Sequence, residues 1–488
     1  MARTRGERRP EDAWAAAEAV RRGEVTSEEL VERSLECVAR FDGVVNAFTV
    51  VLADQARVRA READALHASG AGERLPLLGV PISVKDHVWL AGAPATNGSA
   101  ALRDFVPDAD AVPVARLKAA GAVVMGKTNN PEFCYRGYTD NEVFGLTRNP
   151  WATHATPGGS SGGAGASVAY GATPIAVGTD GGGSIRIPAA FCGVVGHKPT
   201  FGLVPKMPGF RGWPSLSVDG PISRSVRDAA LALHVMAGAS PADDLTWPVD
   251  VGDLLGAVTR PVDWSTLRVA VSEDLGWAPV ERSVRAAFRD AVRRLVDDGA
   301  RVTQAQPDAP YPTQLWNDLA LPEGFASEGP LLAKSADLLS AGSREIIEAG
   351  RAASARDYLD ALERRRDYRQ RWDRFFEDYD VLLAPSMPLP AFGVDVTSPG
   401  AIDGVPVDPF FDDWCALALP ANLTGGPACA VPTGWDPSGL PVGMQVMGPR
   451  WADARVLQVA AAWERIAPWG DRWPTPSGAS AVARPHQG

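Results

Sequence analysis

The chain has 488 residues, a net charge of −11, and 45% apolar against 22% charged side chains. This composition is ordinary for a folded protein that buries a sizeable core. The negative net charge argues against sequence-independent nucleic-acid binding, which needs a basic surface. No run of about 18 apolar residues is present to span a membrane.

The five cysteines are scattered through the sequence. They are Cys37, Cys134, Cys192, Cys415 and Cys429. An odd count without a C-x-x-C pair predicts reduced thiols and a cytoplasmic protein. We interpret Cys134 and Cys192, which lie near the motifs below, as small buried apolar side chains. No zinc spacing occurs, so neither a metal nor another cofactor is expected.

The first 70 residues are expected to form a helical region that packs on a core of residues 71–470. Thr26 and Glu29 match a capping box that opens a helix through Arg40. Residues 48–69 are rich in Ala, Arg, Glu and Asp, and they predict a further helix that Gly70 closes. This region shows no chemistry of its own.

Two lysines follow strand-like runs. Leu77 to Val84 is apolar and ends at Lys85, where burial would favour the neutral amine that can accept a proton. Residues 122–125 predict a second strand, which leads to Lys127. Lys127 lies in a polar stretch where we expect its charge to stay solvated. Lys85 is therefore the preferred base.

A loop with polar and aromatic side chains follows the second strand. Its candidates for a substrate pocket are Asn130, Phe133, Tyr135 and Tyr138. Aromatic side chains beside a catalytic site suit an acyl or aryl group. Ordinary packing is the alternative interpretation.

The segment from Thr156 to Pro188 carries two glycine-flanked serine sites. Ser160 and Ser161 precede a small apolar run, residues 162–170, that predicts a tightly packed helix. Residues 174–178 predict a buried strand that leads to Ser184. Gly181, Gly182 and Gly183 leave the backbone amides before Ser184 uncovered, and converging amides beside a serine can hold an oxyanion.

Two other kinds of site fit this segment less well. None of the six histidines lies in a G-x-S-x-G elbow, and that motif is absent. No G-K-[ST] follows the glycines, as a phosphate-binding loop requires. A Ser–Lys pair is a known alternative to the Ser–His–Asp triad. An incidental pair of glycine–serine turns is the remaining alternative.

The rest of the chain alternates strands and helices. Residues 202–221 predict an irregular segment with Trp213, and residues 280–298 an amphipathic helix. Residues 300–380 predict a mostly helical cap, in which Trp316 is a pocket candidate with core packing as the alternative. Residues 380–385 predict a strand and 454–466 a last helix. Residues 471–488 are expected to form a flexible tail.

The motifs G-G-S-S-G-G, G-T-D-G-G-G-S-I-R-I-P-A and V-K-D, together with K-T-N-x-x-E-F, resemble the amidase signature family. The resemblance implies an α/β fold with a central twisted mixed sheet flanked by helices on both sides. It implies that Ser184 is the nucleophile and that Lys85 is the ultimate base. Ser160, which follows a cis Gly159–Ser160 peptide bond, would bridge the two. It also implies supporting roles for Ser161 and Thr179, and for a pair formed by Asp180 and Arg186.

The implied activity is hydrolysis of carboxylic amides through an acyl-enzyme, without a cofactor. The motif form is closer to bacterial aryl-acylamide, carbamate and cyclic-oligoamide hydrolases than to the tRNA amidotransferase subunit. The expected partner is a small hydrophobic amide, carbamate or ester, and no nucleic acid or membrane. The alternatives are a non-catalytic scaffold and a glutamine-hydrolysing amidotransferase subunit. The chain is expected to be a monomer or a homodimer.

Overall fold

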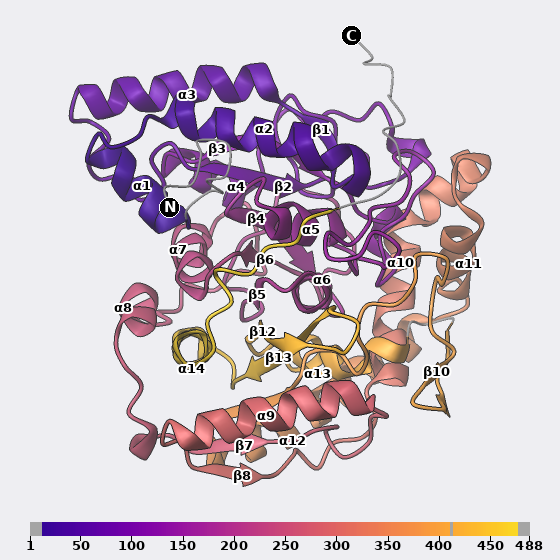
Figure 1. Cartoon of the computed structure of the whole chain (residues 1–488). Coiled ribbons are helices and arrows are strands. Elements are labelled where there is room, and N and C mark those ends of the chain that lie inside the picture. The colour runs from indigo at the N-terminus through magenta and orange to yellow at the C-terminus, as the bar shows by residue number, and fades with distance from the viewer. Residues whose placement is uncertain (1–11, 410–412, 477–488) are drawn as a thin grey trace.

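A computed structural model describes residues 12–409 and 413–476 (Figure 1). Its centre is an 11-stranded mixed sheet with the order β1-β3-β2-β4-β6-β5-β12-β13-β9-β7-β8, and a small sheet joins β10 and β11. The strands are β1 Phe48–Val51, β2 Pro81–Lys85, β3 Val123–Thr128, β4 Ile175–Asp180, β5 Val195–Lys198, β6 Val218–Ser223, β7 Val269–Val271, β8 Val302–Gln304, β9 Val381–Pro385, β10 Ala401–Ile402, β11 Val405–Pro406, β12 Ala428–Trp435 and β13 Pro441–Met447.

Helices cover both faces of the large sheet, as the sequence predicts (Figure 1). They are α1 Ala13–Arg21, α2 Ser27–Val45, α3 Ala53–Ala68, α4 Val112–Ala119, α5 Gly162–Tyr170, α6 Arg186–Cys192, α7 Val226–Met236, α8 Leu254–Thr259, α9 Arg282–Asp297, α10 Thr313–Ser335, α11 Ala341–Ala349, α12 Ala355–Asp378, α13 Leu419–Thr424 and α14 Asp453–Ile466.

Strand β4 shows how the two faces are separated. Ile175 and Val177 pack into the cluster formed with α4, α7 and α14, whereas Ala176 packs into the cluster formed with α2, α5 and α6. Successive side chains of a strand point to opposite faces, so β4 is buried on both sides. The apolar run at residues 174–178 is the sequence signal of that double burial.

The prediction of a helix over residues 48–69 is wrong at its start. Phe48–Val51 form the edge strand β1, which pairs antiparallel with β3, and the helix begins only at Ala53. The reason is that aromatic and β-branched side chains fit a pleated surface better than a helix. The N-terminal region therefore contributes a strand to the central sheet as well as helices.

Helices α10, α11 and α12 form most of residues 300–380. In Figure 1, α10 and α11 lie at the right side of the molecule, and α12 is labelled at the bottom, near β7. We call residues 313–378 the cap. Within the predicted tail, residues 477–488 lie outside the described residues, and 471–476 have no regular structure. No helix in the described part of the chain is long and apolar enough to cross a membrane.

Candidate active site

The candidate site lies where β2 and β4 end. The two strands are parallel neighbours, with Val84 opposite Val177. Parallel strands end at the same edge of a sheet, so Lys85, the last residue of β2, lies beside Thr179 near the end of β4. Side chains 75 or more residues apart in sequence are thereby brought together.

Lys85 is fully buried. Its Nζ donates hydrogen bonds to Ser160 Oγ and to Thr179 Oγ1, both at 2.7 Å. Burial lowers the pKa of this amine, because removal from water disfavours the charged form. The amine can therefore exchange protons with the Ser160 hydroxyl it contacts.

The Ser160 loop is tied to the end of β4. The Gly159–Ser160 peptide bond is cis, and a Cβ at Gly159 would collide with the backbone of Tyr138. The Ser161 amide donates to the Ser184 carbonyl at 3.2 Å, while the Ser161 hydroxyl contacts the backbone of Thr179. The backbone of the two serine loops is thus held in direct contact.

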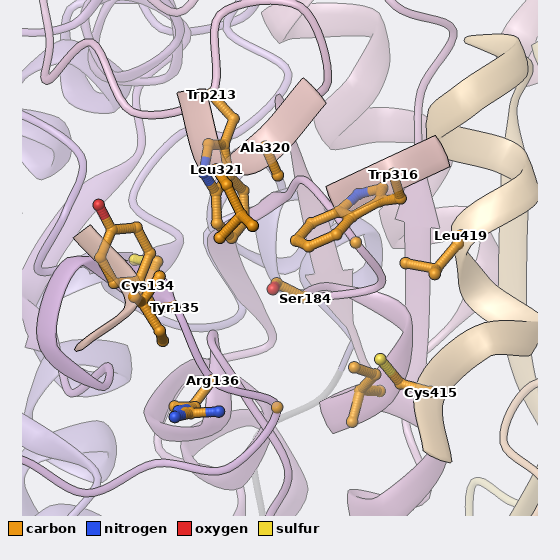
Figure 2. A pocket seen from close by; sticks show the side chains of 14 residues that line it. Cys134, Tyr135, Arg136, Ser184, Trp213, Trp316, Ala320, Leu321, Cys415 and Leu419 are labelled. Carbon is orange, nitrogen blue, oxygen red and sulfur yellow. The ribbon is translucent and has the colours of Figure 1, made fainter. Parts of the chain in front are cut away.

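Ser184 is 8% exposed and lines a cavity, into which its side chain points (Figure 2). Among the described residues, no hydrogen bond joins its hydroxyl to that of Ser160. The Lys85–Ser160 half of the predicted relay is present as a contact, whereas the Ser160–Ser184 half remains a prediction.

The predicted oxyanion amides are not equivalent. The Gly183 amide already donates to Asp180 Oδ1 at 2.8 Å. The prediction that this amide is available to hold an oxyanion is therefore wrong. In the described part of the chain, the amides of Gly181, Gly182 and Ser184 have no hydrogen-bond partner. An oxyanion needs donors that are not already satisfied, and these three meet that requirement.

Asp180 and Arg186 form a fully buried ion pair that shapes the loop. Arg186 Nε and Nη2 each donate to the Asp180 carboxylate at 3.0 Å. The same carboxylate accepts from the amides of Gly183 and Ile185. Burial opposes ionisation of Asp180, but the Arg186 guanidinium outweighs it and holds the pKa of the carboxyl below its usual value.

Two residues that sequence analysis missed complete this network. Asn422 Nδ2 donates to Asp180 Oδ1 at 2.9 Å, and Asn422 Oδ1 accepts from Arg186 at 2.7 Å. Gln445 Oε1 accepts from Arg186 Nη1 at 3.0 Å. The segments P-A-N-L-T-G-G and M-Q-V-M contain these residues, but more than 230 residues separate them from the loop.

The cavity beside Ser184 is aromatic on one side (Figure 2). Trp213 and Trp316 lie perpendicular with ring centroids 4.9 Å apart, and Tyr135 stacks on Trp213 at 5.6 Å. Trp316 Nε1 also donates to the Gly181 carbonyl at 2.9 Å. The cap therefore supplies a wall of the cavity and a direct hydrogen bond to the loop that carries Ser184.

The other predicted pocket residues lie elsewhere. The Asn130 side chain accepts a hydrogen bond from the His87 amide at 3.1 Å. Phe133 does not line the cavity; it packs with Leu339 and Ile347, and its ring lies 5.7 Å from that of the cavity-lining Tyr135. Tyr138 lines a neighbouring cavity of about 370 Å³. The predictions of Asn130, Phe133 and Tyr138 as pocket residues are wrong for this cavity, because loop position alone does not determine where a side chain points.

Sequence analysis also missed several lining residues. Besides Tyr135, Trp213 and Trp316, the cavity wall includes Cys134, Arg136, Ile187, Ala320, Leu321, Ile346, Cys415 and Leu419. Cys134 is buried, as expected, but it lies beside Lys85 and Ser160. Burial raises the pKa of its thiol, while the neighbouring Lys85 opposes that shift. Nothing in the sequence E-F-C indicates this contact.

Lys127 is fully buried, so the expectation of a solvated charge is wrong. Its Nζ donates to the carbonyls of Asp86 at 3.0 Å and Pro94 at 3.3 Å, and burial lowers its pKa to about 8. Lys127 thus contacts backbone carbonyls, whereas Lys85 contacts a motif serine. Residues 12–409 and 413–476 contain no group of three His, Cys, Asp or Glu side chains arranged to hold a metal.

Comparisons with known proteins give a consistent result. The family model described as Amidase matches residues 29–457. A glutamyl-tRNA(Gln) amidotransferase subunit from Roseiflexus sp. (strain RS-1) is 38% identical over 487 residues, covering 94% of this chain and 97% of that protein. The acylamidase of Rhodococcus erythropolis is 37% identical over 476 residues, covering 95% and 97%. The solved structure of a bacterial aryl acylamidase has a TM-score of 0.88 and 30% identity, covering 97% of this chain and 99% of that one.

Proposed function

The chain belongs to the amidase family of amide hydrolases, and from this premise we propose that it is a serine hydrolase that cleaves carboxylic amides through an acyl-enzyme on Ser184. The observation that carries the proposal is the buried Lys85 amine, which contacts Ser160 Oγ at 2.7 Å beside the loop of Ser184. A serine hydroxyl is a weak nucleophile until a base takes its proton. A neutral, buried lysine can supply that base through a second hydroxyl.

In the first half of the reaction, Ser184 loses its proton to Ser160 as Ser160 passes its own proton to Lys85. Ser184 Oγ then bonds to the substrate carbonyl carbon, and the free amides of Gly181, Gly182 and Ser184 hold the oxyanion. The proton returns through Ser160 to the substrate nitrogen. The C–N bond breaks, and the amine leaves.

In the second half, water replaces the amine. Water gives a proton to the Ser160–Lys85 pair as its oxygen bonds to the acyl carbon. The ester bond to Ser184 breaks, and the proton returns to Ser184 Oγ. The products are a carboxylic acid and the resting enzyme. Esters and carbamates would follow the same path, because they also pass through a tetrahedral centre.

We propose a hydrophobic acyl or aryl amide as the substrate. The support is the wall formed by Tyr135, Trp213 and Trp316. The cavity measures only about 50 Å³, whereas a cavity of roughly 150 Å³ is known to hold benzene. Binding of an aryl group therefore requires the cap side chains to shift.

A second candidate function is the glutamine-hydrolysing amidotransferase subunit. It is favoured by the 38% identity to the Roseiflexus protein over 94% of this chain. It would require partner chains and a glutamine substrate. Glutaminase activity without anilide turnover would favour this candidate over the first.

We further propose that the protein acts in the cytoplasm, as a monomer or homodimer and without a cofactor. The support for the cytoplasmic setting is the odd number of cysteines without a C-x-x-C pair. Size-exclusion chromatography with light scattering measures the oligomeric state.

The test is a panel of anilides, esters, carbamates, primary amides and glutamine, assayed with the wild type and with Ser184→Ala. We expect the wild type to favour anilides and Ser184→Ala to lose nearly all turnover. A fluorophosphonate probe should label the wild type at Ser184. A wild type that neither reacts with the probe nor turns over any amide would instead indicate a non-catalytic scaffold.

A further inference from the structure

A second cavity, of about 560 Å³, lies between α12, the segment around Ser215 and the end of α13. Arg365 of α12 lines it and donates to the carbonyls of Ser215, Asn422 and Leu423 at 2.9, 3.2 and 2.8 Å. Of the described residues, none lines both this cavity and the cavity of Ser184. It is a separate site.

The wall of the second cavity is cationic. It contains Arg365, Arg366 and Arg369 of α12 and Arg450, and no acidic side chain in the described part of the chain lines it. The whole chain has a net charge of −11, so a general excess of basic residues does not explain this concentration. Arg366 is already paired with Glu363 at 2.6 Å, so it is the guanidinium groups of Arg365, Arg369 and Arg450 that favour an anion at this cavity.

The hydrogen-bonding capacity of these arginines is not fully used. Nε of Arg369 and Nε of Arg450 are both buried without a hydrogen-bond partner among the described residues. Asp373 lies 3.7 Å from Arg369 Nε, which is too far for a hydrogen bond. A buried donor that is left unpaired costs free energy, and a bound acceptor would remove that cost.

The arginines also repel one another. Burial lowers the pKa of Arg365 to about 10; Glu323 and Tyr358 oppose this shift, and the smaller effects of Arg369 and Arg450 add to it. Burial likewise lowers the pKa of Arg450, and its neighbour Arg369 adds to the shift. An anion in the cavity would reverse these effects, because opposite charge favours the protonated guanidinium.

Flat apolar surfaces complete the wall. Trp247 is 54% exposed, and it lines the cavity together with Phe201 and Tyr358. An exposed tryptophan beside arginines offers a stacking face for a ring next to the anion donors. The volume lies in the range that holds a small organic ligand.

We propose that this second cavity binds a small aromatic dianion, either a phosphate monoester or a dicarboxylate that carries a flat ring. The guanidinium groups bind the dianion through paired N–H···O contacts, and the ring of the ligand stacks on the aromatic wall. The site lies next to the support of the nucleophile loop, because Asn422 accepts from Arg365 through its backbone and donates to Asp180 through its side chain.

The test is isothermal titration calorimetry of the full chain with phenyl phosphate and with phthalate. Binding does not require turnover, so this measurement does not depend on the proposed hydrolase function. We expect at least one of the two ligands to bind, and inorganic phosphate and benzyl alcohol to bind at least tenfold more weakly. Arg369→Gln and Arg450→Gln should each weaken binding about tenfold, since a charge-assisted hydrogen bond contributes on that scale.

The matched control is Arg371→Gln, on the same helix but paired with Asp308 outside the cavity. It should leave binding unchanged, and circular dichroism should show all three variants folded. The proposal is overturned if neither aromatic dianion binds, if benzyl alcohol or inorganic phosphate binds as tightly, or if Arg371→Gln weakens binding as much as Arg369→Gln and Arg450→Gln do.

Discussion

Asp180→Asn tests directly how the loop of Ser184 is held in place. The Asp180 carboxylate accepts five hydrogen bonds, of 2.8 to 3.2 Å, from two loop amides, Arg186 and Asn422. Asparagine would leave the Arg186 cation buried without a counter-charge. Breaking a buried ion pair in this way costs about 3–5 kcal/mol. We therefore expect the free energy of unfolding to fall by that amount.

The assay is equilibrium unfolding in urea, with two kinds of control. Glu62→Gln removes one partner of an exposed pair with Arg59 and should cost less than about 1 kcal/mol. In a double-mutant cycle with Arg186→Met, the double variant should lose clearly less than the sum of the two single losses, because it no longer buries a lone charge.

The pH dependence gives a further check on the same pair. The pKa of Asp180 is lowered in the folded state, so its stabilising contribution is present above its unfolded pKa, near 3.8, and is lost as the pH falls. The difference between wild type and Asp180→Asn should shrink at low pH. A loss within about 1 kcal/mol at pH 7, or strictly additive losses in the cycle, would refute the reasoning.

Three further predictions follow from single contacts. Lys85→Ala should lower kcat/KM by roughly 10²–10⁴-fold. The rise in rate that follows deprotonation of the amine should disappear, and the rate should recover only in part, at higher pH, where hydroxide can act as the base. An unchanged pH profile would exclude the amine as base. Trp316→Phe keeps an aromatic wall but removes the hydrogen bond to the Gly181 carbonyl, so kcat for an anilide should fall about fivefold, as the loss of roughly 1 kcal/mol implies; an unaltered kcat would contradict this. Burial raises the pKa of Glu464 from 4.5 to about 7, so this group lowers stability as the pH rises through that interval. Glu464→Gln, which keeps an acceptor for the Val226 amide, should raise stability at pH 8 by roughly 3 kcal/mol and little at pH 5 in urea unfolding.

The residues next to the strand ends were predictable because local sequence determines them. Lys85 ends an apolar run, and the serine loops carry the glycines that close approach requires. That these residues meet was implied only by the resemblance to the family, and the structure accounts for it by the parallel pairing of β2 and β4. Lys127 was misjudged because its neighbours along the chain are polar, while the groups that bury it come from elsewhere in the fold.

The walls of the cavity were less predictable. Phe133 and Tyr135 flank Cys134 in the sequence, yet Tyr135 lines the cavity, whereas Phe133 packs against Tyr135 without lining it. Phe133 and Cys134 have positive φ values of 53° and 63°, a conformation that side chains other than glycine seldom adopt. This local turn redirects the side chains, and no residue type in the segment indicates it.

The hydrogen bonds of Arg186 affect when the loop of Ser184 can be completed during synthesis of the chain. Arg186 binds Ala418 and Asn422 near α13 and Gln445 in β13, more than 230 residues further along the chain. During synthesis the serine loops leave the ribosome long before these acceptors exist. A nascent chain therefore cannot complete the hydrogen bonds of Arg186 until β13 has been made.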